Sequence, residues 1–130
     1  MKRMQWGLIG LMLCGIFMAA GAVKAEDPVK VAPNIYTVKF ENEKVRVSEI
    51  RFKPGDKAPM HQHPDHFVYV LTAATMQLSH PDGKVDEISA VPGQVMWIPA
   101  ETHAGTNIGS TEFNALVVEL KPLPEYTTAE

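Results

Sequence analysis

Apolar and polar positions divide the 130-residue chain into two unlike parts. Residues 4–23 contain no charged side chain, and their centre, residues 8–18, is almost wholly apolar. From residue 35 onward, short segments instead alternate apolar and polar residues, as strands do when they bury one face. The pattern therefore predicts an apolar leader followed by a domain built of β-strands.

Turn signals separate the alternating segments. Pro-Gly pairs at 54–55 and 92–93 are typical of tight turns, because Pro presets φ and Gly accepts a positive φ. Pro81-Asp82-Gly83 is a further hairpin signal. The expected strands cover residues 35–40, 45–52, 67–71, 75–79, 85–88, 95–98 and 113–120. No part of the chain after the leader shows a sustained 3.6-residue apolar period, so we predict an all-β antiparallel sandwich or barrel.

The leader has the features of a secretory signal peptide. It begins with Lys2 and Arg3, and Val23-Lys24-Ala25 places small residues where a signal peptidase reads them. We expect cleavage after Ala25 and a periplasmic or secreted protein. An uncleaved membrane-spanning helix is the alternative, because the uncharged run is close to the necessary length of about 20 residues. Cys14 lies mid-leader, which does not suit lipoprotein processing, and its removal would leave no cysteine.

One domain is expected after the leader. We assign residues 26–33 to a flexible arm, residues 34–122 to a β-barrel domain and residues 123–130 to a C-terminal tail. Without the three basic residues of the leader, nine basic residues remain against 15 acidic ones, a formal charge of −6. This acidic balance gives no basic surface for nucleic acid or, once the leader is removed, for an anionic membrane.

Four of the five histidines fall in two places along the chain. His61 and His63 are two residues apart, so on an extended strand both rings project from the same face. His66 follows three residues later, after a Pro64-Asp65 pair that should break the strand and reset its phase. His103 lies 40 residues beyond His63. Neutral imidazole is the commonest protein ligand of transition metals, and this clustering in a His-poor chain favours a metal site over chance.

The residues around these histidines resemble the two motifs of the cupin family. Gly55 precedes the H-x-H pair by six positions, as in the first motif. Residues 93–107 resemble the second motif in the spacing from its glycine to its proline, and in Asn107, four residues after His103. The resemblance implies a double-stranded β-helix, or jelly-roll barrel, that holds one divalent transition metal through the motif histidines.

The chain departs from the family pattern at two places. His66 stands where the family usually has a metal-binding glutamate, and the segment from Pro99 to His103 is one residue short. We expect His66 to be a fourth ligand; the alternative is that it packs beside a three-histidine site or bonds to Asp65. An all-imidazole shell keeps the full +2 charge, which favours an anionic ligand. It also disfavours magnesium and calcium, leaving iron, zinc, nickel, copper and manganese open.

Other residues near the motifs also have expected roles. Asn107 is expected to orient His103 or a bound ligand, and Glu101 is the nearest general acid or base. His80 is expected to be a solvent-exposed turn residue. The side chains expected to line an apolar pocket are Met60, Tyr69, Met76, Met96 and Trp97, with ordinary strand packing as the alternative for each.

Two functional classes stay open. Small one-domain cupins include metal-dependent dioxygenases, isomerases and decarboxylases, so the resemblance favours a metal-dependent enzyme, dioxygenase-like or isomerase-like, with a small organic substrate. The alternative is a protein that binds a metal or small metabolite without turnover, which a fourth protein ligand would favour. No nucleophile elbow, glycine-rich phosphate loop or cysteine nucleophile follows the leader. Whether the chain forms a homodimer is open at this point.

Overall fold

The structure, a computed structural model, describes residues 25–123, which are built almost entirely of β-strands. A short helix precedes nine strands: α1 (Pro28–Val31), β1 (Tyr36–Glu41), β2 (Val45–Phe52), β3 (Lys57–His63), β4 (His66–Val70), β5 (Ala74–Ser79), β6 (Val85–Ala90), β7 (Val95–Ile98), β8 (Glu101–Asn107) and β9 (Phe113–Leu120). The expected signal peptide and most of the expected tail lie outside the described residues. Within residues 25–123, no helix combines the length and the hydropathy needed to cross a bilayer.

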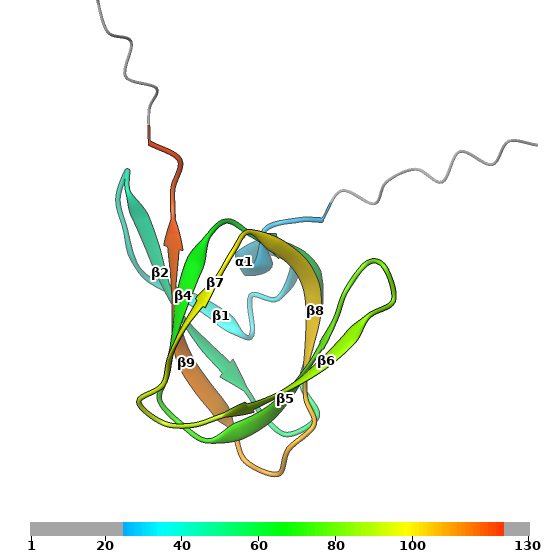
Figure 1. Cartoon of the computed structure of the whole chain (residues 1–130). Helices are drawn as coiled ribbons and strands as arrows, with labels where there is room; N and C mark the ends of the chain where they lie inside the picture. The colour runs from blue at the N-terminus through cyan, green and yellow to red at the C-terminus, as the bar shows by residue number, and fades with distance from the viewer. Residues whose placement is uncertain (1–24, 124–130) are drawn as a thin grey trace, which may run out of the picture.

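The strands form two antiparallel sheets. One has five strands in the order β1-β2-β9-β4-β7, and the other has four in the order β3-β8-β5-β6. Figure 1 shows the two sheets facing each other across a common interior, with the chain passing repeatedly from one to the other. This is a jelly-roll barrel, so the predicted all-β class is confirmed.

The Pro-Gly turns form as the sequence predicts. Gly55 and Gly93 have φ values of 84° and 83°, a region that side chains with a Cβ rarely adopt. The Asp56 N–H donates to the Lys53 carbonyl at 2.9 Å in the first turn, and the Gln94 N–H donates to the Val91 carbonyl at 3.0 Å in the second. Each turn sends the chain from one sheet to the other.

The segment expected to be a flexible arm is instead packed on the barrel. Asp27 caps α1 by accepting a hydrogen bond from the Val29 N–H at 2.8 Å, and Pro28 is buried in the first turn. The Glu26 carbonyl accepts from the Gln62 N–H at 3.0 Å, which attaches the segment to β3. Prolines and low apolar content suggested a loose arm, but this N-terminal cap and the contact with β3 order the segment.

Strand β8 was absent from the sequence prediction. Its inward positions are occupied by His103, Gly105 and Asn107, all buried. An apolar/polar alternation therefore cannot reveal this strand, because the side chains on its inner face are not apolar.

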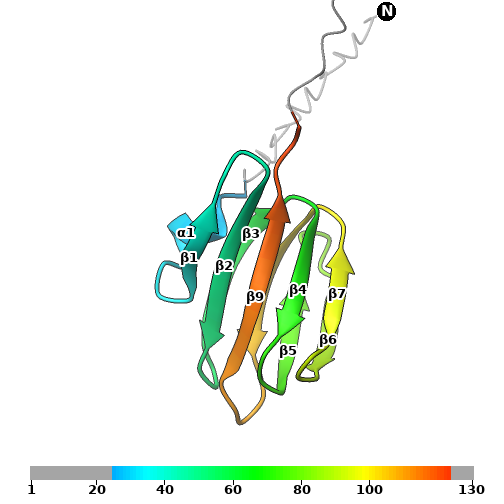
Figure 2. The same cartoon turned by 90° about the vertical axis from the view of Figure 1, so that its left-hand side faces the viewer.

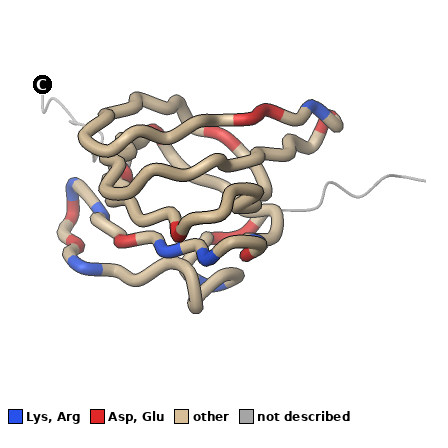
Figure 3. The backbone as a smooth tube through the Cα atoms, turned by 90° about the horizontal axis from the view of Figure 1, so that it is seen from below, with Lys and Arg blue, Asp and Glu red and all other residues tan. Residues whose placement is uncertain are grey.

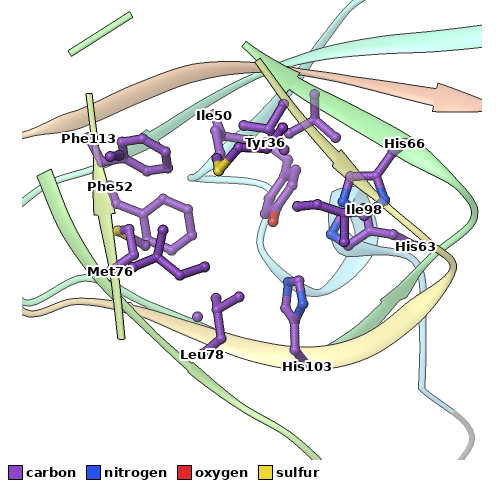
Figure 4. A pocket seen from close by; sticks show the side chains of 16 residues that line it. Tyr36, Ile50, Phe52, His63, His66, Met76, Leu78, Ile98, His103 and Phe113 are labelled. Carbon is purple, nitrogen blue, oxygen red and sulfur yellow. The ribbon is translucent and has the colours of Figure 1, made fainter. Parts of the chain in front are cut away.

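The interior has an apolar end and a histidine end. Phe52 and Phe113 lie with ring centroids 6.4 Å apart at the apolar end, and the Tyr36 ring lies 6.4 Å from Phe52 toward the other end. Figure 4 shows this arrangement, with Phe52 and Phe113 on one side of Tyr36 and the histidines on the other. The fold thus gathers the histidines at one end of the interior and aromatic side chains at the other.

Candidate metal centre

Three strands from both sheets bring four imidazoles together. His61 and His63 are inward-facing residues of β3, and the register of β3 with β8 sets His61 directly opposite His103. His66 is the first residue of β4 in the other sheet, because Pro64 and Asp65 end β3 as the sequence predicts. All four side chains are buried, with exposures of 0%, 5%, 2% and 7% in chain order.

The Nδ1 atom of every one of these rings is engaged by an acceptor. In His61 it lies 2.6 Å from the Pro59 carbonyl, and in His66 it lies 2.8 Å from the Pro64 carbonyl. In His63 and His103 it lies 2.7 Å from a carboxylate oxygen, of Glu119 and Glu101 respectively. Because these oxygens can only accept, each Nδ1 carries a proton and donates it. In its neutral form each ring therefore presents the lone pair of Nε2, as metal-binding histidines do.

Three of the four rings form a compact donor set. The ligand atoms of His61, His63 and His103 lie within 4.8 Å of one another. His66 is not part of this set, although its ring centroid lies 4.7 Å from that of His63. Three buried imidazole nitrogens in one set could hold a divalent transition metal, and their chemistry fits the group that the sequence predicts. Ligation by His66 stays a prediction.

Burial keeps the histidines ready to bind. It lowers the pKa of His61 to about 4, with a smaller contribution from the neighbouring rings of His63 and His103. Burial also lowers the pKa of His66. Neutral rings are the metal-binding form, so at neutral pH protons do not compete with a metal at His61 or His66.

Glu119 was missed by the motif analysis. It is 3% exposed, and besides accepting from His63 it binds Arg46 at 2.5 Å. Burial alone would raise its pKa, but the hydrogen bonds from His63 and Arg46 and their charges hold the pKa below its usual value. Arg46 in turn binds Asp27 at 2.6 Å, which connects the N-terminal segment to the histidine cluster. The sequence did contain a signal for Glu119: it is a carboxylate at a position of the predicted strand 113–120 where the alternation calls for an inward, apolar side chain.

Tyr36 was also missed. Its hydroxyl lies 3.2 Å from Nε2 of His61, and since Nδ1 of that ring carries the proton, the hydroxyl is the donor. Burial, and then the charge of Glu119, raise the pKa of Tyr36 well above its usual value. The hydroxyl therefore stays protonated beside the three-histidine set.

An apolar cavity of about 70 Å³ adjoins the histidines. Met76 and Met96 line it, as predicted, together with His63, His66 and His103. The lining side chains seen in Figure 4 point into this space from both sheets. The histidines thus border a space that is otherwise apolar.

The other three predicted pocket residues do not line this cavity. Tyr69 and Trp97 are 42% and 50% exposed. Both lie on the outer face of their sheet, because the residues adjacent to them in β4 and β7 are the ones that point inward. Met60 likewise precedes the inward-facing His61 and is not among the lining residues. For Tyr69 and Trp97, period-two alternation decides the direction of the side chain. At Met60 the register shift of β3 between Ala58 and His61 interrupts that alternation.

Asn107 does not have the role expected of it. Its side-chain amide donates to the Phe52 carbonyl at 2.9 Å and to the Thr111 carbonyl at 2.8 Å, and its oxygen accepts from the Gly109 N–H at 3.0 Å. Gly109 and Thr111 lie in the β8–β9 connection and Phe52 ends β2, so the Asn107 side chain ties this connection to β2 and makes no hydrogen bond to His103.

Glu101 and His80 lie near the metal centre. Glu101 accepts from His103 Nδ1, and this hydrogen bond, opposed by burial, lowers the pKa of Glu101. His80 was expected to be exposed, but its side chain is only 19% exposed, binds Asp86 at 3.0 Å and lies 6.5 Å from the ring of His103. His80 lies in the β5–β6 hairpin and pairs with Asp86 on β6, a cross-strand contact that the turn motif alone could not reveal.

Comparison with solved structures decides the family. A cupin domain from Bordetella pertussis Tohama I is 32% identical, covering 68% of this chain and 93% of that one, with a TM-score of 0.63. The chain belongs to the cupin superfamily. A double-stranded β-helix protein from Klebsiella pneumoniae is similar at 22% identity, with 68% and 76% covered and a TM-score of 0.55. The polyketide cyclase RemF from Streptomyces resistomycificus is 26% identical, with 73% and 72% covered and a TM-score of 0.51.

Two other comparisons find nothing: no protein-family model and no curated protein matches this cupin. Its membership therefore rests on the solved structures and on a fold that agrees with the two motifs in the sequence.

Proposed function

We propose that this cupin binds one divalent transition metal through His61, His63 and His103 and acts on a small organic molecule in the adjoining cavity. The observation that carries the proposal is the set of three buried imidazoles, each with Nδ1–H donated to an acceptor so that Nε2 is the ligand atom. At His61 the metal would take the place of the Tyr36 hydroxyl, which donates to that Nε2. Three protein ligands leave coordination positions for a substrate, whereas a closed four-ligand shell is typical of a structural site.

The reaction class that fits best is that of a metal-dependent oxidoreductase or isomerase. A bound transition metal would supply Lewis-acid or redox chemistry. The Tyr36 hydroxyl can donate a hydrogen bond to an oxygen of the ligand, and Nε2 of His66 can accept one. Met76, Met96 and the other apolar side chains exclude water from the ligand.

The size of the cavity limits the substrate. About 70 Å³ admits roughly five water-sized groups, since each needs about 10–15 Å³ of such space. A molecule of a few non-hydrogen atoms fits this volume, and a polyketide does not. We therefore do not extend the cyclase activity named for RemF to this chain.

The ligand preference also follows from the charges around the site. Two carboxylates, Glu119 and Glu101, contact metal-binding histidines and offset part of the metal's charge, although Glu119 is itself paired with Arg46. A site made of four imidazoles alone would strongly favour an anionic substrate. The two carboxylates reduce this preference here. Iron, zinc, nickel, copper and manganese all suit nitrogen donors.

A non-catalytic binding protein is the second candidate. It is favoured by the closeness of His66 to His63, with ring centroids 4.7 Å apart, because a fourth imidazole would leave fewer positions for a substrate. Metal-loaded protein is incubated with a panel of small carboxylic acids and ketones, and turnover is followed by oxygen consumption for an oxidoreductase and by NMR of the products for an isomerase. Only an enzyme gives either signal.

Metal content tests the site directly. Protein purified from its own compartment is analysed by elemental mass spectrometry, with one metal per chain expected. His103→Ala should lose the metal, whereas His80→Ala, which removes a histidine 6.5 Å away, should keep it. Equal metal content in the two variants would remove His103 from the site.

Export is part of the proposal. The charged start, apolar run and Val23-Lys24-Ala25 exit support removal of a signal peptide and a periplasmic or secreted protein. Intact-mass analysis of the exported protein should give a chain that begins at Glu26. A mass that includes Met1 would contradict cleavage.

A further inference from the structure

The Tyr36 hydroxyl occupies one of the three ligand atoms of the candidate metal centre. It lies 3.2 Å from Nε2 of His61, whose Nδ1 lies 2.6 Å from the Pro59 carbonyl. A neutral imidazole has one N–H and one lone pair, so the lone pair of Nε2 accepts the phenol hydrogen. A metal at His61 needs that same lone pair. The metal and the hydroxyl therefore compete for one atom.

This competition is confined to His61. Nε2 of His63 and Nε2 of His103 accept no hydrogen bond from any residue in the described range 25–123, since only the Nδ1 atoms of these rings have partners there. The other tyrosine in that range, Tyr69, is 42% exposed on the outer face of β4. The two tyrosines thus differ in place and not in chemistry, which makes Tyr69 a matched control.

The Tyr36 ring is fixed at the wall of the cavity. Figure 2 shows β1 at one edge of the five-stranded sheet, directly after α1. Tyr36 is the first residue of β1, and its N–H donates to the Ala32 carbonyl at 3.0 Å. The ring stands edge-on to Phe52 and His61, with centroids 6.4 Å and 5.6 Å away. Because these contacts keep the ring in place, metal binding turns the hydroxyl about its C–O bond and does not expel it.

A hydroxyl released from His61 needs another acceptor. Tyr36 is only 5% exposed, so water outside the barrel cannot solvate it. Burial raises the pKa of the phenol well above its usual value, so the hydroxyl keeps its hydrogen. Leaving a buried donor unpaired costs roughly 5–150-fold in the equilibrium that creates it. Metal binding without a new acceptor therefore carries this penalty.

The cavity beside the ring offers few acceptors of its own. Apart from the histidines, the side chains that line it together with Tyr36 are apolar. With a metal on His63 and His103, the imidazole lone pair that remains on the wall is that of His66 Nε2. Figure 4 shows the Tyr36 hydroxyl at the inner end of its ring, pointing into this space. A ligand held in the cavity therefore meets the hydroxyl directly.

The charges of the protein do not replace the hydroxyl in selecting the ligand. The carboxylate oxygens of Glu119, whose charge acts on Tyr36, are already held by His63 and Arg46. Figure 3 shows acidic and basic residues interspersed along the backbone rather than gathered by sign. A neutral carbonyl oxygen therefore meets the requirement as a carboxylate does, since each has a lone pair for the hydroxyl.

We propose that Tyr36 couples metal binding to the binding of a small ligand with an acceptor oxygen. In the metal-free protein the hydroxyl holds Nε2 of His61, and once released it donates to a carbonyl or carboxylate oxygen of the ligand. Metal alone leaves a buried donor unpaired, whereas metal and ligand together do not, so each strengthens the binding of the other by the same factor. Tyr36 is thus a positioning residue that selects oxygen ligands. The coupling rests on the proposed function, because it requires a metal at His61.

The matched variants Tyr36→Phe and Tyr69→Phe test the coupling. The zinc affinity of the exported protein is measured at neutral pH by competition with a chromophoric chelator, with and without saturating acetate. Without acetate, Tyr36→Phe should bind zinc at least about fivefold more tightly than the wild type, because no hydrogen bond competes for His61. Acetate should raise the zinc affinity of the wild type about 5–150-fold more than that of Tyr36→Phe. Tyr69→Phe should match the wild type in both conditions.

A tyrosine difference spectrum in the near ultraviolet gives an independent measurement on the unsubstituted protein. Zinc should perturb the spectrum as the hydroxyl leaves His61, and acetate should perturb it again. Both changes should be absent from Tyr36→Phe. Both should persist in Tyr69→Phe, which assigns them to Tyr36 even if Tyr36→Phe does not fold.

The possible results separate the coupling from the proposed function. If the wild type binds no zinc, or if His103→Ala binds it equally, the metal site is wrong and the coupling falls with it. If zinc binds through the histidines and Tyr36→Phe matches the wild type with and without acetate, the coupling alone is wrong. Tighter zinc binding by Tyr36→Phe with an equal gain from acetate would also overturn it, because the released hydroxyl would then donate to a protein acceptor such as His66.

Discussion

The Glu119 carboxylate accepts a 2.7 Å hydrogen bond from Nδ1 of His63, although 56 positions separate the two residues in the chain. His63 ends β3 in the four-stranded sheet, and Glu119 lies on β9 in the five-stranded sheet. The bond therefore joins the two sheets at the candidate metal centre. It also fixes the tautomer that leaves Nε2 of His63 free to bind a metal.

We predict that Glu119→Gln weakens metal binding. The amide cannot hold Nδ1–H as strongly as the carboxylate does, so the ring loses basicity and orientation, and removal of such partners typically costs about 10–100-fold in affinity. Competition titrations with a chromophoric chelator measure the change. The control is Glu87→Gln on the outer face of β6, which should bind as the wild type does. Equal affinity in all three proteins would mean that Glu119 has no positioning role.

Arg46 is predicted to contribute more to stability than its neighbour Arg51. Its side chain is 16% exposed and lies between Glu119 and Asp27, whereas that of Arg51 is 55% exposed. Arg46→Met leaves the buried Glu119 charge with one partner fewer and should cost about 2–3 kcal/mol of unfolding free energy. Arg51→Met removes only solvent-exposed ion pairs and should cost clearly less. Urea unfolding of both variants, on the same strand, gives the comparison; similar losses would contradict the assigned role of Arg46.

Much of the barrel could be predicted from the sequence, because its strands obey period-two alternation. The prediction for residues 45–52, 95–98 and 113–120 matches β2, β7 and β9 residue for residue. Strand β8 escaped because its inner face carries His, Gly and Asn. The helix α1 was not predicted, because four residues are too few to show a helical period. Only the Asp27 cap and Pro28 signal its start.

The metal centre could be predicted only in part, for a similar reason. Spacing on a strand reveals His61 and His63, and the motif adds His103. The partners of these residues lie on other strands, and the strand register decides which residues meet. Glu119 on β9 pairs with Arg46 on β2 and with His66 on β4. No local pattern encodes such cross-strand neighbours, which is why Glu119 and Tyr36 were missed.

Asn107 is predicted to matter for folding and not for metal binding. It is fully buried, and its three hydrogen bonds hold backbone groups of Phe52, Gly109 and Thr111. Asn107→Ala leaves these groups without partners and should cost about 2–4 kcal/mol. Thermal unfolding measures the loss, and metal titration of the folded variant should give the wild-type affinity. A specific loss of metal affinity would restore the role first expected from the motif.

The metal-free protein should become less stable as the pH falls below about 6.5. The pKa of His61 is about 4 in the folded protein and about 6.5 in an unfolded chain. Between these values the unfolded state binds more protons, so the free energy of unfolding decreases with falling pH, by up to about 3 kcal/mol for this group. The lowered pKa of His66 acts in the same direction. Above pH 6.5 the contribution is complete and constant.

Urea unfolding of chelator-treated protein at pH 7.0, 5.5 and 4.5 measures this dependence. His61→Gln removes the group that titrates and should flatten it, with part of the slope retained because His66 is still present. A slope unaffected by the substitution would show that His61 is protonated alike in the folded and unfolded states.

The last prediction concerns the number of imidazoles that bind the metal. The compact set contains His61, His63 and His103, while His66 bonds through Nδ1 to the Pro64 carbonyl and borders the cavity. On this geometry, His66→Gln should lower metal affinity by less than the about tenfold that is the lower limit for a partner of a ligand, because His66 hydrogen-bonds to none of the three histidines. His61→Gln removes a ligand and should lower the affinity far more. Losses of equal size in the two variants would make His66 the fourth ligand that the sequence first suggested, and would favour the binding protein over the enzyme.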